Sequence, residues 1–189
     1  FAVRRSTSPP QQRRYMFVYT CFSLTRDLDG LNSALVGHLS SKSFAFLPVN
    51  NASSSAALAG THWYVLFSFS CCSHYYRSLL VCDVSARRFL HFDSMNHMNR
   101  SPAERIASSI ASCLWGRRSS APVIMSASPQ QRNNSDCGIF VVEFIEQIAR
   151  QIKDDKRDLA VSDGTLSSAD RRKWLFDIIR QFPCTKHEK

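Results

Sequence analysis

The sequence predicts one α+β domain, with a central, mostly antiparallel sheet packed by helices. Short segments that are rich in β-branched and aromatic residues and bounded by turn-like clusters indicate strands. Three other segments carry apolar residues at every third or fourth position, which is the spacing of one helix face. The 189 residues are 44% hydrophobic and include 13 Phe and 3 Trp, enough for one sizeable core. No internal repeat or second domain is visible.

The strands are expected mainly in the first two thirds of the chain. Residues 1–14 contain paired arginines and almost nothing to bury, so we expect a basic disordered tail before a domain at residues 15–189. A short strand and then a helix near Asp29–His38 should open this domain. The other strands are predicted at residues 43–49, 63–69, 79–84, 88–92 and 121–125.

Three helices are predicted from their start signals and apolar faces. The first starts at Ser101-Pro102-Ala103-Glu104, which supplies an N-cap, a Pro at the first helical position and a capping-box Glu. The second opens at Cys137 or Gly138 and runs to about Gln151, with one face toward the sheet. The third spans about Ser168–Gln181, and its residues expected to face inward are Trp174, Leu175, Ile178 and Phe182.

Composition limits the class of protein and its partners. The net charge is +9, but the basic residues are scattered without an aromatic ladder, so we expect a solvated basic surface and no nucleic-acid partner. An acidic face on a protein substrate is another explanation. Seven cysteines without a C-x-x-C pair indicate reduced thiols and no structural zinc. No apolar run reaches the ~18 residues of a membrane helix, so we expect no membrane partner and a place in the cytoplasm or nucleus. We also expect the protein to be a monomer.

The strongest candidate for chemistry is Cys137, which stands between a polar loop and an apolar helical run. The first N–H groups of a helix favour a thiolate, but a thiol of ordinary pKa (~8.5) also needs a base at neutral pH. His62 lies where a polar loop enters a predicted strand, and Asp93 ends another strand, so they suit a base and its orienting acceptor. Gln131, six residues before Cys137, is placed to donate to an oxyanion.

Each of these residues also has a structural explanation. A free cysteine is most often buried packing, and a single histidine is most often structural. Asp136 is explained equally well as the N-cap of the helix that follows it. Gln131 is also explained as an ordinary loop amide. From the residue types and their spacing alone, an acyl-transfer site is therefore one hypothesis among several.

Three motifs together resemble the Ulp/SENP cysteine proteases, which remove ubiquitin-like modifiers. The order His, Asp, Gln, Cys and the six-residue step from Gln to Cys are similar to that family. The motifs are Gly60-Thr61-His62-Trp63, His91-Phe92-Asp93-Ser94, and Pro129-Gln130-Gln131 with Asn133 and Asp136-Cys137-Gly138. The stretches most similar to the deneddylating branch of the family are Phe46–Asn51, Thr61–Trp63 and Arg172–Trp174.

The resemblance implies a papain-like fold of the Ulp/SENP type, with the site in a groove between sheet and helix. It assigns His62 as the base, Asp93 as its orienter, Cys137 as the nucleophile and Gln131 as the oxyanion donor. It implies that Trp63 lines a narrow tunnel for the Gly-Gly tail of the modifier, although a core aromatic is the alternative. It implies no cofactor and no metal. The implied partners are the neddylation modifier, or SUMO as second choice, and its conjugates.

Three features depart from the family pattern. The family has an upstream helix with a Trp-Leu-Asn/Ser-Asp motif, and the only tryptophans here are Trp63, Trp115 and Trp174. We therefore expect the domain to lack that helix and one wall of the tunnel. Ser135 stands where an aromatic residue usually precedes Asp-Cys. An added hairpin is expected at Cys71–Tyr76.

Other functions stay open from the sequence. One is a SUMO-specific isopeptidase with the same chemistry. Another is a modifier-binding module that has lost turnover, and a third is an acyltransferase on the same fold. Metal-dependent hydrolysis is the weakest, because His91 and Asp93 are only two residues of a site and no H-E-x-x-H motif accompanies them.

Overall fold

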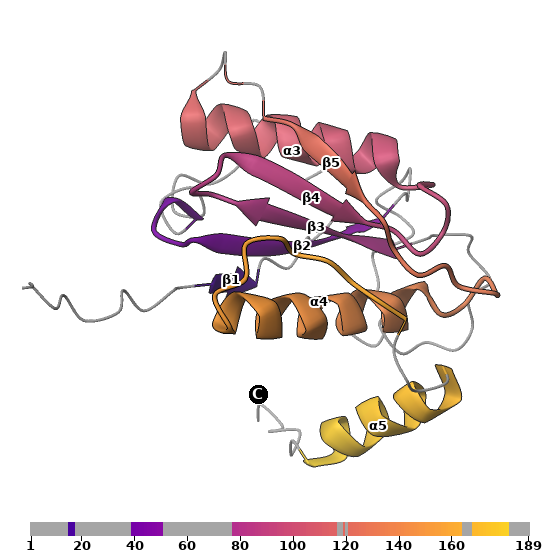
Figure 1. The fold of residues 1–189 in the computed structure, drawn as a ribbon. Coiled ribbons are helices and arrows are strands. Elements are labelled where there is room, and N and C mark those ends of the chain that lie inside the picture. The colour runs from indigo at the N-terminus through magenta and orange to yellow at the C-terminus, as the bar shows by residue number, and fades with distance from the viewer. Residues whose placement is uncertain are drawn as a thin grey trace, which may run out of the picture.

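The computed structural model describes residues 15–17, 39–50, 77–116, 119, 121–163 and 168–181. These residues form an α+β fold in which a five-stranded sheet lies between helices (Figure 1). Several predictions lie outside the described residues, namely the tail at 1–14, the helix near 29–38, the strand at 63–69, the hairpin at 71–76 and the inward side chains of Ile178 and Phe182.

The sheet has antiparallel strands in its middle and one parallel strand at each edge. Its order is β1-β2-β3-β4-β5, and the antiparallel pairs β2–β3 and β3–β4 contain most of the paired residues, as predicted. The strands are β1 (Tyr15–Phe17), β2 (Phe44–Asn50), β3 (Arg77–Asp83), β4 (Arg88–Phe92) and β5 (Val123–Ser126). The strand predictions that fall on described residues are therefore confirmed.

Helices cover both faces of the sheet. Helix α3 (Arg100–Trp115) lies on one face and α4 (Cys137–Lys153) on the other, while α5 (Ser168–Gln181) lies beside α4 on the side away from the sheet (Figure 1). The predicted ranges of the second and third helices are confirmed, and α4 runs slightly beyond Gln151. In the part of the chain that the structure describes, no helix combines the length and apolarity needed to cross a bilayer.

Alternate side chains of the strands enter two separate cores, as the two-residue period of a strand requires. The core under α3 contains Ala45, Leu47, Leu80, Phe89, Ile106 and Ile110, and the core under α4 contains Phe46, Val81, Phe92, Phe140, Phe144 and Ile148. The Phe144 ring lies 6.2 Å from Phe92 and 5.8 Å from Phe140 between centroids. This packing holds α4 against the sheet and so places its first residue.

The start of α3 differs from the prediction. Ser101 is not the N-cap, because the helix begins two residues earlier than predicted and Asn99 takes that position. The physical reason is a contact from outside the helix, since Oδ2 of Asp93 accepts the N–H of Asn99 at 3.0 Å. Both polar atoms of the Asn99 side chain are buried without a hydrogen-bond partner, for which we have no physical account.

Three further details of the helices also differ from prediction. Pro102 is the third residue of α3, still within the first turn where a missing N–H does no harm. Glu104 closes no capping box and accepts from Nε of Arg100 at 2.9 Å. In α5, Leu175 is buried as predicted, but Trp174 is 39% exposed, because the helix is covered on only one side.

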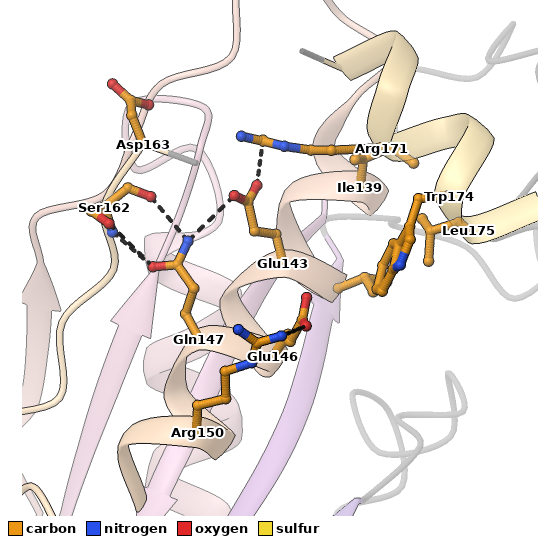
Figure 2. Close-up of a pocket in the computed structure, with 11 residues that line it drawn as sticks. Ile139, Glu143, Glu146, Gln147, Arg150, Ser162, Asp163, Arg171, Trp174 and Leu175 are labelled. Atoms are coloured by element: carbon orange, nitrogen blue, oxygen red, sulfur yellow. Dashed lines mark hydrogen bonds and ion pairs between the residues drawn. The ribbon is translucent and has the colours of Figure 1, made fainter. Parts of the chain in front are cut away.

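The segment 159–163 returns along α4 and is held by two glutamines that are one turn apart. Gln151 bonds through Nε2 to the carbonyl of Ala160 at 2.6 Å and through Oε1 to its N–H at 3.1 Å. Gln147 bonds in the same way to Ser162, at 3.0 Å for both contacts (Figure 2). Each side-chain amide therefore pairs with the backbone as a neighbouring peptide group does in a sheet.

Candidate active site

Asp93 follows β4 directly and is completely buried. Its Oδ1 accepts the backbone N–H of Met95 at 2.8 Å, and Oδ2 accepts that of Asn99 at 3.0 Å. Between them, Asn96 and His97 have φ values of 46° and 64°, a left-handed backbone that residues with side chains adopt rarely. The carboxylate is thus fixed by the loop that carries it.

The loop before α4 lies against the Asp93 loop. Ser94 donates from Oγ to Oε1 of Gln131 at 2.9 Å, and its carbonyl accepts the N–H of Gln131, also at 2.9 Å. Gln130 donates from Nε2 to the carbonyl of Asp93 at 3.0 Å, and its Oε1 accepts the N–H of Asn96 at 2.7 Å. The structure therefore brings together the loops that carry Asp93 and Gln131.

The side-chain amide of Gln131 has a defined orientation. Because Oε1 faces the hydroxyl of Ser94, Nε2 faces the opposite way and donates to the carbonyl of Asn133 at 2.5 Å. An amide nitrogen carries two hydrogens, so one N–H remains for a further acceptor. A side-chain donor to an oxyanion requires such an N–H.

Cys137 is the first residue of α4 and is only 1% exposed. The first N–H groups of a helix have no intrahelical acceptor, so the thiol lies at the positive end of the helix dipole. Asp136 occupies the N-cap position, but its side chain makes no capping hydrogen bond. Asp136 is therefore the N-cap by position, as predicted, but its carboxylate does not cap the helix.

The Asp136 carboxylate is instead bound from two sides. Its Oδ2 accepts Nδ2 of Asn133 at 2.8 Å, and its Oδ1 contacts Nη2 of Arg172 on α5. Oδ1 of Asn133 also accepts the backbone N–H groups of Ser135 and Asp136, at 2.9 and 3.0 Å. Together these contacts fix the turn that precedes Cys137.

Two predicted site residues, His62 and Trp63, lie outside the described residues, so the base and the tunnel residue stay predictions. Sequence reasoning misses two residues that support the site. Ser94 could be found from the sequence, because it directly follows Asp93. Arg172 lies in a stretch that resembles the deneddylating branch, but nothing in the sequence connects it to Asp136, because it is one of three consecutive basic residues of a helix.

His91 is buried in β4, where it binds other partners than Asp93. Its Nε2 lies 2.8 Å from Oγ of Ser78, and its Nδ1 lies 3.3 Å from Sδ of Met125. Burial lowers the pKa of His91 to about 4, and the charge of Asp93 opposes this shift only in part. Among the described residues, no group of three or more His, Cys, Asp or Glu side chains is placed to hold a metal ion.

A cavity of about 540 Å³ lies between α4, the segment 159–163 and α5 (Figure 2). Arg171 forms an ion pair with Glu143 at this cavity. Burial raises the pKa of Glu143, and the charge of Arg171 opposes the shift. The lining does not include Asp93, Gln131 or Cys137, so the cavity is separate from the candidate site.

The structure places a thiol at the start of a helix, and the loop before this helix contacts the loop of a buried carboxylate, an arrangement that suits a domain of the cysteine peptidase type. Residues 26–185 match the Ulp1 protease family, C-terminal catalytic domain. Because this match covers most of the chain, the chain belongs to that family. The family predicted from the three motifs is thereby confirmed.

Relatives agree with this family. Probable sentrin-specific protease 8 of Dictyostelium discoideum is 32% identical over 123 residues, which cover 60% of this chain and 43% of that protein. NEDD8-specific protease 2 of Schizosaccharomyces pombe is 26% identical over 153 residues, which cover 79% of this chain and 33% of that protein. The chain therefore spans less than half the length of these two relatives.

A solved structure supports the fold. The effector protein XopD of Xanthomonas campestris, in a structure bound to ubiquitin, has a TM-score of 0.54 at 19% identity. The similarity covers 85% of this chain and 77% of that one. At this level of identity it bears on the fold alone, and it confirms the α+β architecture of the Ulp/SENP type that the motifs imply.

Proposed function

We propose that this chain is a thiol protease that cleaves after the C-terminal Gly-Gly of a ubiquitin-like modifier, with the neddylation modifier NEDD8 as preferred substrate. The observation that carries the proposal is the contact between the Asp93 and Gln131 loops through Ser94, next to the helix that begins at Cys137. An acceptor for a base, an amide donor and a thiol then stand on adjoining segments. That set suits acyl transfer.

In the proposed reaction, His62 takes the proton of the Cys137 thiol, and the thiolate attacks the carbonyl carbon of the modifier's last glycine. The oxyanion accepts hydrogen bonds from the N–H of Cys137 and the amide of Gln131. The C–N bond then breaks, and protonated His62 gives its proton to the leaving amine, which leaves a thioester. Water then attacks the carbonyl carbon of the thioester and gives a proton to His62, the C–S bond breaks to regenerate the Cys137 thiolate, and the modifier is released with a free carboxylate.

Asp93 orients His62 in this proposal. Each carboxylate oxygen has two lone pairs, and each oxygen of Asp93 accepts one backbone N–H. One lone pair on each oxygen therefore remains for a ring N–H of His62, while the backbone contacts hold the carboxylate still. Trp63, the residue after the base, lines the tunnel through which the Gly-Gly tail reaches the thiol.

The choice of modifier is supported by relatives. The name of the fission yeast relative supports NEDD8, as do the stretches that resemble the deneddylating branch. Probable sentrin-specific protease 8 of Dictyostelium belongs with the deneddylating branch that those stretches resemble, and the second candidate, a SUMO-specific isopeptidase, rests on the shared family alone. The two candidates share the site and its chemistry, so only a comparison of substrates separates them.

Fluorogenic substrates made from NEDD8, SUMO and ubiquitin, each with a coumarin amide on its C-terminal glycine, test the proposal. We expect the highest kcat/KM with NEDD8. A higher kcat/KM with SUMO would move the assignment to the second candidate. Binding of a modifier with no turnover, and with no reaction toward a modifier vinyl sulfone, would contradict the protease proposal itself.

Two cysteine variants locate the reaction. Cys137→Ser should abolish both turnover and labelling by the vinyl sulfone, while the thermal unfolding temperature stays close to that of the wild type. Cys113→Ser is the matched control, because it removes an exposed free thiol on α3. It should change neither the turnover nor the labelling by the vinyl sulfone. Peptide mapping that finds the probe on Cys113 would indicate adventitious thiol reactivity.

A further inference from the structure

Arg172 of α5 reaches the residues that precede the proposed nucleophile. Its Nη2 contacts Oδ1 of Asp136 and also donates to the carbonyl of Ser135 at 3.3 Å. The side chain of Asp136 is 3% exposed and that of Arg172 is 25% exposed, so the pair is largely shielded from water. In such surroundings, removal of one partner leaves a poorly solvated charge.

Asp136 influences Cys137 in two ways. Its ψ angle of −1° sets the plane of the peptide group that carries the N–H of Cys137, so the contacts that fix Asp136 also direct that N–H. Its carboxylate is also one residue from the thiol, and a negative charge at that position disfavours a thiolate. The guanidinium of Arg172 offsets this repulsion.

We propose that Arg172 is a positioning residue of this site, which neutralises the Asp136 carboxylate and holds the turn before Cys137. The proposal rests on the proposed function in one respect, namely that Cys137 is the nucleophile. Arg172 acts through Asp136, and it makes α5 part of the machinery that prepares the thiol. The consequence is a turn in which the charge of Asp136 is balanced and the peptide group that carries the N–H of Cys137 is held in one orientation.

Arg171 offers a matched control in the same helix. It also forms an ion pair from α5 to α4, with Glu143, and its guanidinium lies 5.7 Å from the centroid of the Phe140 ring. Glu143 stands more than one turn along α4 from Cys137. This second pair therefore fastens α5 without a contact to the turn before the thiol, and its loss should weaken the docking of α5 alone.

The pH dependence of Cys137 alkylation by iodoacetamide tests the proposal, with peptide mapping by mass spectrometry. Arg172→Gln should move the midpoint of the rate profile upward by about one pH unit and slow alkylation at neutral pH about tenfold. Asp136→Asn, with Arg172 present, should move the midpoint downward. The double variant Asp136→Asn/Arg172→Gln should return it close to the wild-type value.

Arg171→Gln separates positioning from stability. It should lower the thermal unfolding temperature about as much as Arg172→Gln does, yet leave the midpoint in place. An unchanged midpoint in Arg172→Gln, or an equal shift in Arg171→Gln, would overturn the proposal. If Arg172→Gln does not fold, Asp136→Asn tests the proposal instead. A midpoint of alkylation that does not move downward in Asp136→Asn would also overturn the proposal.

Alkylation requires no modifier, so this result is independent of whether the chain cleaves NEDD8. With an active substrate the same variants give a second readout. Arg172→Gln should lower kcat at neutral pH and leave KM nearly unchanged, and Arg172→Lys, which keeps the charge, should recover part of kcat. A rise in KM without a fall in kcat would assign Arg172 to substrate binding and contradict a positioning role.

Discussion

Ser94 and Gln131 are joined by two hydrogen bonds of 2.9 Å, one from the serine hydroxyl to the side-chain oxygen of the glutamine and one between their backbones. The backbone contact holds the two loops together. The hydroxyl contact has a different effect, because it holds Oε1 of the amide toward Ser94 and so leaves Nε2 on the opposite side. Loss of the hydroxyl should therefore disturb the proposed oxyanion donor more than the fold.

Ser94→Ala should lower kcat on a modifier substrate about tenfold with little change in KM, because the Gln131 amide is then held only by its contact with the carbonyl of Asn133. The free energy of unfolding should fall by only about 1 kcal/mol. Ser128→Ala is the control, since it removes a hydroxyl bonded to the carbonyl of Ser126 in the same loop, and kcat should not change. An unchanged kcat in Ser94→Ala would argue against Gln131 as a donor.

Asp93→Asn should lower the free energy of unfolding by about 1–3 kcal/mol, apart from any effect on activity. The amide has one acceptor oxygen where the carboxylate has two, so its NH2 faces a backbone N–H of Met95 or Asn99. Urea denaturation measures the change. The exposed Asp158→Asn should stay within about 0.5 kcal/mol of the wild type. Equal stability of the two variants would show that Asp93 does not anchor its loop.

His91 should make the fold sensitive to acid. Its pKa is about 4 in the folded chain, against an ordinary value of 6.5. The unfolded chain therefore binds a proton as the pH falls below 6.5 while the folded chain does not, and stability present above 6.5 is lost progressively toward pH 4, by ~3 kcal/mol in total.

Urea unfolding of the wild type and of His91→Asn, each at neutral pH and near pH 4, tests this acid sensitivity. The variant lacks the titrating ring, so it should lose less stability between the two pH values, even if it is less stable at neutral pH. The groups that also act on His91 are the charges of Asp93, His97 and Glu104. An equal loss in both proteins would mean that the buried ring is not the cause.

The cysteine of the core under α3 and the cysteine on the surface of that helix should differ in reactivity. Burial raises the pKa of Cys82 to about 12, and the neighbouring Asp83 carboxylate adds to the shift. Cys113 is exposed. In the native chain at mildly alkaline pH, iodoacetamide should modify Cys113 and spare Cys82, and in concentrated urea both should react. Equal modification of the two in the native chain, measured by mass spectrometry, would contradict the burial of Cys82.

The elements with a strong periodic pattern are predictable from the sequence. β4 occupies the predicted residues 88–92, because aromatic residues between turn-like clusters indicate a strand. α4 begins at Cys137, one of its two predicted starts, because the apolar residues that follow have helical spacing. The start of α3 is not predictable in this way. It depends on the carboxylate of Asp93, which binds the N–H of Asn99 and overrides the local capping signal at Ser101.

The candidate site is predictable in its residue types but not in its supports. Asp93 and Gln131 come together because each stands at the end of a strand or before a helix, where loops meet. The pairing of Asp136 with Arg172 is not predictable, because Arg172 is 36 positions away and belongs to another helix. No local pattern connects two residues at that separation, and a surface arginine looks the same in the sequence whether it is paired or not.

Gln147 and Gln151 also fix the register of the chain that leads toward α5. Four residues along a helix rise about 6 Å, and two residues of an extended chain span nearly the same length, about 6.6 Å. The spacing of the glutamines thus matches that of Ala160 and Ser162. An insertion or deletion of one residue before Ala160 would turn the other face of the segment toward α4 and exchange its buried side chains for exposed ones. The same change would shift the point from which α5 starts.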